Sequence, residues 1–202
     1  MLPITSLPQD YSDNMAHISP KPLSEYPWFV RWVLRRQERK YGRVLAPSFL
    51  WGRLPGAFLS MLTSLAFFQR KRFPIEESLR SLLSVRIAQL NSCSFCVDLN
   101  SYTFFCASGA AEKPEQVGRW RESKLFSDRE RAALEYAEVV TTEPGAVDGA
   151  RMAALRNHFS DDEITALTAW IAFQNMSAKF NAALGAEEHG FCALPAYHGE
   201  GS

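Results

Sequence analysis

The sequence predicts an all-α protein built as one domain, and three observations support that prediction. Ala and Leu together number 45, against 22 for Val, Ile and Thr, a balance that favours helices over strands. Between Pro74 and Asn91 apolar residues recur at three- and four-residue spacing, which indicates an amphipathic helix. The pattern Ser-x-x-Glu, typical of a helix start, occurs at Ser127 and again at Ser160. A chain of 202 residues is long enough for one substantial core and short for two.

Prolines, glycines and capping residues set the expected boundaries of the elements. An irregular arm is expected over 1–22, a helical domain over 23–190 and a loop tail over 191–202. At the break between the third and fourth helices, Asn91 is expected to take the left-handed conformation and Ser92 to cap the next helix. The expected helices cover 24–41, two pieces within 49–69, 75–91, 93–109, a short segment at Pro114, 127–142, 148–159 and 160–184.

Charge and hydropathy exclude two classes of partner. The 22 basic and 22 acidic side chains cancel without a basic stripe, so neither nucleic-acid binding nor an acidic-membrane anchor is expected. The most apolar window, Phe49 to Phe68, is interrupted by Arg53 and by the pair Pro55-Gly56, which argues against a membrane-spanning helix. Residues 1–22 lack the basic start and apolar run of a signal peptide, so a cytoplasmic location is expected. In that reducing compartment the four cysteines are not presumed to form structural disulfides.

The spacing of Cys93 and Cys96 is the sequence feature that indicates a chemical function. Thiols at positions i and i+3 lie on one face of a helix, close enough to form a small disulfide ring. With Ser92 as the cap, Cys93 is expected at the first helical position, where unpaired N–H groups and the helix dipole stabilise a thiolate. A thiolate attacks a peroxide or a disulfide, and a second thiol resolves the product. The alternative is that both cysteines only pack in the core.

No metal site is expected, because zinc needs a second cysteine pair or paired histidines at ligand spacing. The remaining cysteines, Cys106 and Cys192, have no nearby partner in the sequence. No bound cofactor is implied either, so reducing equivalents would come from a small thiol or a dithiol partner protein. The four histidines are dispersed, at His17, His158, His189 and His198.

Residues 85–98, VRIAQLNSCSFCVD, resemble the core of the AhpD-like alkylhydroperoxidases, which belong to the carboxymuconolactone decarboxylase superfamily. The resemblance continues through 120–127, 130–134 and the last long helix, and spans roughly 74–185. It implies an all-helical homo-oligomer, whether dimer, trimer or hexamer, with the two cysteines at the start of a helix. It also implies a thiol-dependent reaction for which an organic hydroperoxide is a candidate substrate.

The same resemblance shows where this chain departs from the redox members of the family. Those proteins carry a glutamate twelve residues before the first cysteine and a histidine four residues after the second, and the two form a proton relay. Here these positions are Ser81 and Asn100, and neither side chain acts as a general base near neutral pH. Glu77, one helical turn before Ser81, and Asp98, two residues after Cys96, are the candidate substitute bases.

Three functions are compatible with these features. The first is a thiol-dependent peroxidase or disulfide oxidoreductase; by the resemblance Cys93 lies nearer solvent than Cys96, and the sequence leaves open which one attacks. The second is a decarboxylase that acts on a lactone carboxylate, with Arg80 and Arg86 as the available cations. The third is a helical oligomer without turnover, whose thiol pair is vestigial or a slow redox sensor. Serine substitution of the cysteines separates them: turnover is lost in the first case, persists in the second and is absent throughout in the third.

Overall fold

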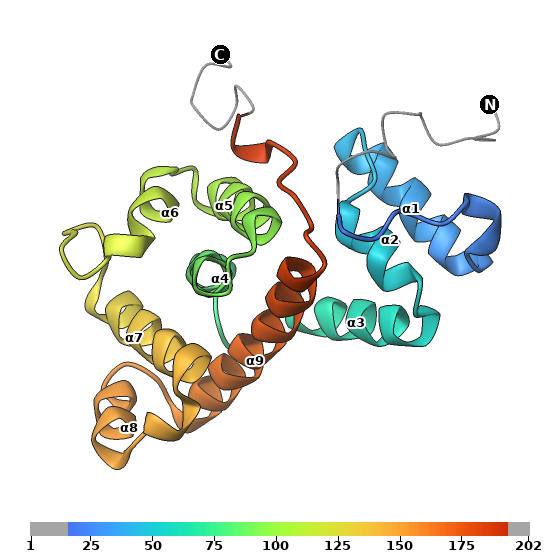
Figure 1. Ribbon diagram of the computed structural model, residues 1–202. Helices are drawn as coiled ribbons and strands as arrows, with labels where there is room; N and C mark the ends of the chain where they lie inside the picture. The colour runs from blue at the N-terminus through green and yellow to red at the C-terminus, as the bar shows by residue number, and fades with distance from the viewer. Residues whose placement is uncertain (1–15, 194–202) are drawn as a thin grey trace. The chain divides into compact units, whose positions relative to one another are not determined.

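Helices and their connecting loops make up residues 16–193, the part of the chain that the computed structural model describes. No strand occurs in that part, in agreement with the all-α prediction. The described residues group into two units, one of 16–68 with 183–187 and the other of 69–182 with 188–193 (Figure 1). The second unit begins near Pro74, where the family resemblance starts. Within 16–193 no helix has both the length and the apolar character that crossing a bilayer requires.

The first unit contains α1 (Trp28–Tyr41), α2 (Ala46–Gly52) and α3 (Pro55–Phe68). α1 begins at Trp28 and not at Ser24, which corrects the predicted start. Pro27 disfavours the helical conformation at the residue before it, and Tyr26 is indeed extended, with ψ at 141°. Residues 23–25 therefore form only a short 3-10 turn, η2 (Leu23–Glu25).

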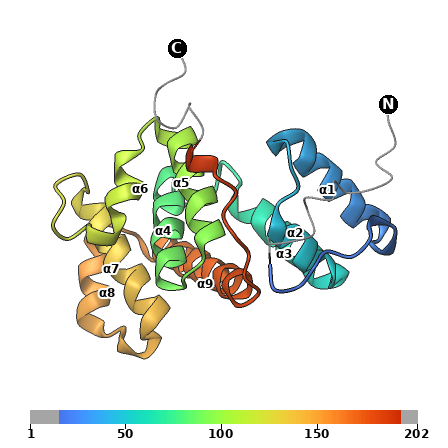
Figure 2. The same ribbon diagram turned by 45° about the horizontal axis from the view of Figure 1, so that its top comes forward.

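The second unit is built around α4 (Glu77–Leu90). Figure 1 looks down the axis of α4, with α5, α6, α7 and α9 around it, and Figure 2 shows α5 alongside α4. Residues 79–85 are buried without a break, including the polar Arg80, Ser81 and Ser84. The predicted amphipathic face is therefore wrong for this stretch, because α4 is covered on all sides. The other elements of this unit are α5 (Ser94–Ser108), α6 (Glu112–Gln116), η3 (Val117–Arg119), α7 (Asp128–Thr142), η4 (Pro144–Ala146), α8 (Gly149–Arg156), α9 (Asp161–Ala183) and η5 (Phe191–Ala193).

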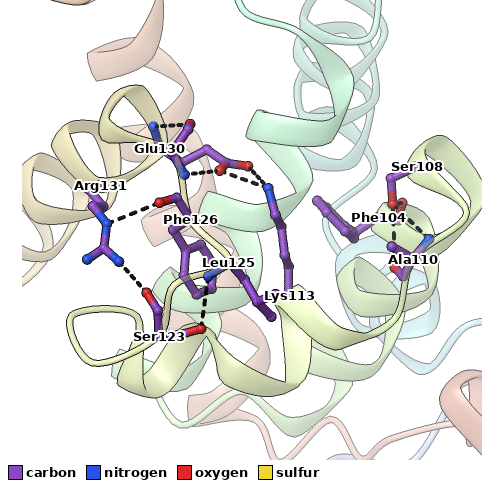
Figure 3. Close-up of polar contacts among 10 residues, drawn as sticks. Phe104, Ser108, Ala110, Lys113, Ser123, Leu125, Phe126, Glu130 and Arg131 are labelled. Carbon is purple, nitrogen blue, oxygen red and sulfur yellow. Dashed lines mark hydrogen bonds and ion pairs between the residues drawn. The ribbon is translucent and has the colours of Figure 1, made fainter.

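Both predicted capping boxes are present, at the starts of α7 and α9. The Ser127 hydroxyl accepts the Glu130 N–H, and the Ser127 N–H donates to Glu130 Oε2 at 2.8 Å. Figure 3 shows that Lys113 of α6 joins the same carboxylate, with Nζ 2.6 Å from Oε1. At the start of α9 the Ser160 N–H donates to Glu163 Oε2 at 2.8 Å, and the Ser160 hydroxyl accepts the Glu163 N–H. Local sequence thus determines where both helices begin.

The predicted arm and tail lie partly outside the described residues, which exclude 1–15 and 194–202. Residues 16–22 have no regular structure, as expected, whereas 191–193 form the turn η5 in place of a loop. The single domain over 23–190 stays a prediction.

Candidate functional site

A tight turn joins α4 to α5 and brings the cysteines to the start of α5. The Cys93 N–H donates to the Ala88 carbonyl oxygen at 2.9 Å, and the Ser92 N–H donates to the Gln89 carbonyl oxygen at 3.1 Å. These two bonds form a Schellman motif, with Ser92 in the left-handed region at φ 55°. The left-handed residue is thus Ser92 and not Asn91, because Asn91 is the last residue held by α4 and the chain reverses one position later.

Cys93 is the N-cap of α5, which moves the predicted cap from Ser92 by one residue. The Cys93 sulfur accepts the Cys96 backbone N–H at 3.2 Å. A disulfide bond joins the two cysteines, whose Cα atoms are 5.2 Å apart. Both are buried, and Cys93, at 1% exposure, is more so than Cys96, at 6%, the reverse of the order that the resemblance implied. The Cys93 sulfur thus lies at the positive end of the α5 dipole, which stabilises negative charge on sulfur once the bond is reduced.

Asn181, near the end of α9, contacts the other sulfur. Its Nδ2 donates to Cys96 Sγ at 3.4 Å. The residue is 3% exposed, and its Oδ1 is buried with no hydrogen-bond partner among the described residues. Asn181 was not among the site residues predicted from the sequence. The available signal was its position on the buried stripe of α9 that also contains Leu167, Ile171 and Ala178, where a polar residue is unexpected.

The two relay positions of the family lie on α4 and α5. Ser81 is buried in the interior of the second unit. Asn100 is partly buried, and its Nδ2 donates to the Cys96 carbonyl oxygen at 2.7 Å. This bond runs to the backbone of the preceding turn and not to a sulfur atom. Neither side chain places a group that titrates near neutral pH beside the disulfide.

Glu77 is the exposed first residue of α4. Because the cysteines follow the last residue of α4, Leu90, the axial rise between the two ends of the helix places Glu77 about 20 Å away along its axis. A carboxylate there reaches a sulfur atom only through intervening groups.

Asp98 is buried, and its carboxylate holds the C-terminal segment 188–193 against α5. Oδ2 accepts the backbone N–H groups of His189 at 2.9 Å and Phe191 at 3.0 Å, and Oδ1 accepts that of Cys192 at 2.9 Å. Both carboxylate oxygens are therefore engaged in anchoring this segment. The sequence did not reveal this role, because no local pattern links residue 98 to a segment so far along the chain.

The anchored segment places a histidine beside the start of α5. The His189 imidazole lies edge-on to the Phe95 ring, with centroids 5.3 Å apart, and is parallel to the Phe191 ring at 6.0 Å. Phe191 in turn stacks on Tyr102, at 5.8 Å. These rings cover the face of α5 that carries Phe95, Asp98 and Tyr102. From the sequence, His189 was only one of four dispersed histidines.

Arg80 is a buried cation on α4, at 6% exposure. Its guanidinium lies between two rings, with Cζ 5.3 Å from the Phe73 centroid and 5.6 Å from that of Trp170. Nε and Nη1 have no hydrogen-bond partner among the described residues. Burial lowers the pKa of this guanidinium, although the charges of Glu77 and Glu76 act in the opposite direction.

Arg86, the other cation considered in the sequence, is engaged by Glu138. Glu138 Oε1 accepts from Arg86 Nε at 2.6 Å and from Trp120 Nε1 at 3.0 Å, and Oε2 accepts from Arg121 Nη1 at 2.7 Å. Burial raises the pKa of the Glu138 carboxyl group, but the three donors outweigh it and hold the pKa below its ordinary value. This network ties α4 to α7 and to the segment between α6 and α7.

The chemistry available at this site is therefore that of a dithiol and its disulfide. Each sulfur receives one N–H, from the backbone at Cys93 and from Asn181 at Cys96. Within residues 16–193, no three His, Cys, Asp or Glu side chains come together in an arrangement suited to a metal ion.

Comparison with known sequences identifies relatives over most of the chain. The sequence model of the carboxymuconolactone decarboxylase family matches residues 56–139. The uncharacterized protein YnjA of Escherichia coli (strain K12) is 42% identical over 174 residues, which cover 86% of this chain and 96% of YnjA.

Comparison with solved structures shows the same fold. The AhpD core structure of an uncharacterized peroxidase-related protein from Ralstonia eutropha JMP134 has a TM-score of 0.81 at 20% identity, covering 90% of this chain and 97% of that one. The debrominase Bmp8 has a TM-score of 0.69 at 19% identity, covering 92% and 95%. The chain therefore belongs to the superfamily of the carboxymuconolactone decarboxylases and AhpD-like alkylhydroperoxidases.

Proposed function

We propose that this protein is a thiol-dependent redox enzyme that cycles Cys93 and Cys96 between dithiol and disulfide. The observation that supports the proposal most directly is the disulfide at the N-terminus of α5, in which each sulfur accepts one hydrogen bond. A cysteine at a helix N-terminus is the setting in which the thiol pKa falls and the reactive thiolate is populated. Peroxidase-related proteins of the same fold agree with this chemistry.

With an organic hydroperoxide as the oxidant, the proposed reaction has two steps. One thiolate attacks a peroxide oxygen, the O–O bond breaks, the alcohol leaves with a proton, and the sulfur becomes a sulfenic acid. The second thiol attacks the sulfenic sulfur, an S–S bond forms and water leaves. The pair has then lost two electrons and two hydrogens. A small thiol or a dithiol protein returns them by thiol–disulfide exchange.

The position of Cys93 makes it the proposed nucleophile. Its sulfur accepts the Cys96 N–H at the positive end of α5, so a thiolate forms there without the glutamate–histidine relay of the family. Glu77 and Asp98 remain candidate bases for deprotonating the second thiol. Neither is placed to take a proton from a sulfur directly, because Glu77 lies about 20 Å away along the α4 axis and the Asp98 carboxylate accepts three backbone N–H groups.

Single-cysteine variants test this proposal. Hydroperoxide consumption with excess dithiothreitol is expected to fall to the protein-free rate in Cys93→Ser. In Cys96→Ser, a sulfenic acid should accumulate on Cys93, detectable by a dimedone adduct located by digestion. Cys106→Ser is the matched control, because Cys106 is exposed and outside the pair, and it should retain full turnover. No turnover in the unmodified protein would reject the enzyme and favour the oligomer without turnover.

One observation supports the decarboxylase alternative. Nε and Nη1 of Arg80, which have no hydrogen-bond partner within residues 16–193, are donors suited to a carboxylate, whereas Arg86 is engaged with Glu138. Decarboxylation of a lactone carboxylate that persists in the variant without both cysteines but is lost in Arg80→Met would establish that function.

We also propose that the protein is a homo-oligomer. In the first unit the large apolar side chains of Trp28, Trp32, Leu59 and Phe67 are at least half exposed in the single chain. Exposed aromatic and aliphatic groups of this size are typical of protein interfaces. Light scattering coupled to size exclusion should give a mass that is a multiple of 22.8 kDa.

A further inference from the structure

We propose that Asn181 sets the redox balance of the Cys93–Cys96 pair by stabilising its reduced form through the Cys96 sulfur. The proposal rests on the thiol redox function above and adds a residue of α9 to that site. It concerns the equilibrium between dithiol and disulfide and not the rate of any reaction with a substrate.

The surroundings of Asn181 do not explain a carboxamide there other than through the sulfur. A buried amide is costly unless it is hydrogen-bonded. The side chain is 3% exposed, and among the described residues its hydrogen bond is the one from Nδ2 to Cys96 Sγ, at 3.4 Å. Its Oδ1 is buried and accepts nothing from residues 16–193.

Asn175, two turns earlier on α9, shows what a structural asparagine looks like in this protein. Its Oδ1 accepts from Asn91 Nδ2 at 2.9 Å, and its Nδ2 donates to Thr141 Oγ1 at 2.9 Å and to the Ile171 carbonyl oxygen at 3.1 Å. Both ends of that amide are satisfied by protein groups. In Asn181, by contrast, the amide oxygen Oδ1 receives no hydrogen bond from the described residues.

The Asn181 amide can form stronger hydrogen bonds with the Cys96 sulfur once the disulfide is reduced. Reduction adds two electrons and two protons and breaks the S–S bond, which leaves Cys96 as a thiol or a thiolate. A thiolate accepts the Nδ2 N–H more strongly than a disulfide sulfur does, because the acceptor is charged. A thiol donates its S–H to Oδ1, which an amide offers after rotation by half a turn. Since either reduced form gains more from the amide than the disulfide does, the equilibrium shifts towards the dithiol.

The experiment is a redox titration of the pair in a dithiothreitol buffer of varied thiol-to-disulfide ratio. The protein is equilibrated without oxygen or hydroperoxide and quenched with acid, its free thiols are alkylated, and the tryptic peptide that begins at Ile87 is weighed. A Cys106→Ser background removes the third cysteine from that peptide. In Asn181→Leu the equilibrium constant should move about tenfold towards the disulfide, which corresponds to about 30 mV.

Two further variants keep the test specific. Asn175→Leu removes a partly buried, hydrogen-bonded amide from the same helix and should lower the unfolding temperature while leaving the redox equilibrium of the pair unchanged. Asn181→Asp keeps the shape of the side chain but offers only acceptor oxygens and a negative charge when ionised. It should also favour the disulfide, increasingly as pH rises and the thiol ionises.

An equilibrium constant in Asn181→Leu within twofold of the unmodified protein would overturn the inference, as would an equal shift in Asn175→Leu. If Asn181→Leu does not fold, an unshifted equilibrium in Asn181→Asp overturns it instead. The titration involves no turnover, so the two proposals fail separately. Suppose that the protein consumes no hydroperoxide and that Asn181→Leu shifts the redox equilibrium constant tenfold. The peroxidase function is then rejected, and the role of Asn181 in the redox equilibrium is supported.

Discussion

At the scale of single residues, the resemblance predicts that Ser81 and Asn100 stand in place of the two relay residues of the family. Asn100 lies four residues after Cys96, on the same face of α5, and its amide donates to the Cys96 carbonyl oxygen. The side chain at this position is therefore already directed towards the turn of α5 that carries the pair.

Asn100→His combined with Ser81→Glu is expected to speed oxidation of the reduced pair by an organic hydroperoxide about 100-fold near neutral pH, because a positioned general base contributes on that order. Stopped-flow oxidation at pH 7 measures the rate constant. Ser81→Gln with Asn100→Gln, which adds size without a base, should stay at the parent rate. A double variant that is no faster than the parent would contradict the relay interpretation.

Arg80 carries a different residue-scale prediction, on stability. Two nitrogen atoms of its buried guanidinium, Nε and Nη1, have no hydrogen-bond partner among the described residues, and burying such groups costs free energy. Arg80→Met keeps an unbranched chain between Phe73 and Trp170 and removes the charge, so the free energy of unfolding should be unchanged or rise by about 1–3 kcal/mol. Urea denaturation measures it. A loss of more than 2 kcal/mol would show that the guanidinium has a partner that stabilises the fold.

At the residue scale, the closeness of Cys93 and Cys96 was predictable, because Cys-x-x-Cys is a local pattern that places both sulfur atoms on one face of a helix. Asn181 and the anchoring role of Asp98 were missed because both residues act on partners 85 and 91 positions away in the sequence. Periodicity tells which face of a helix is buried, but it does not tell which residue that face meets.

At the scale of elements, the turn between α4 and α5 determines where the cysteines lie. Ser92 occupies the left-handed position of this turn at φ 55°, where an L residue other than glycine is strained. Ser92→Gly should raise the free energy of unfolding by about 0.5–1 kcal/mol. Ser94→Gly, two residues later at the first helical position of α5, should lower it by a similar amount. Chemical denaturation measures the free energy of unfolding of both variants. A lower free energy of unfolding in Ser92→Gly would contradict this description of the turn.

The Glu138 network gives a second element-scale prediction, in which pH is the variable. The pKa of this carboxyl group is lower in the folded protein than its ordinary value of 4.5. Its contribution to stability is therefore fully present above about pH 4.5 and is lost as pH falls through the folded pKa. Glu138→Gln should be about 1–3 kcal/mol less stable at pH 7, and the difference should shrink between pH 5 and pH 3. If the difference in free energy of unfolding between the two proteins is constant over this pH range, ionisation of the Glu138 carboxyl group is not its source.

Elements were predictable to the extent that their ends are marked by local chemistry. The capping boxes at Ser127 and Ser160 gave the starts of α7 and α9. The α4–α5 turn was misplaced by one residue, because Asn91 and Ser92 are both acceptable caps by residue type and only the closing hydrogen bonds select between them.

At the scale of the whole molecule, the cysteine site lies entirely in the second unit. The pair is on α5, its second donor on α9, and the segment that Asp98 anchors returns to α5 from beyond α9. The all-α class and the family followed from composition and from the motif around the cysteines. The division of the described residues at Gln69 had no counterpart in the sequence, because no linker-like composition marks that position.

The central claim is that Cys93 and Cys96 form a working redox pair in the full chain. The most direct measurement is the intact mass of the fully reduced protein after one equivalent of an organic hydroperoxide, sampled from seconds to minutes. We predict the loss of two hydrogens, located by digestion to a bond between Cys93 and Cys96, with Cys106 and Cys192 still reduced. Thiols that remain reduced over that interval, or oxidation confined to Cys106 and Cys192, would show that Cys93 and Cys96 are not a working redox pair.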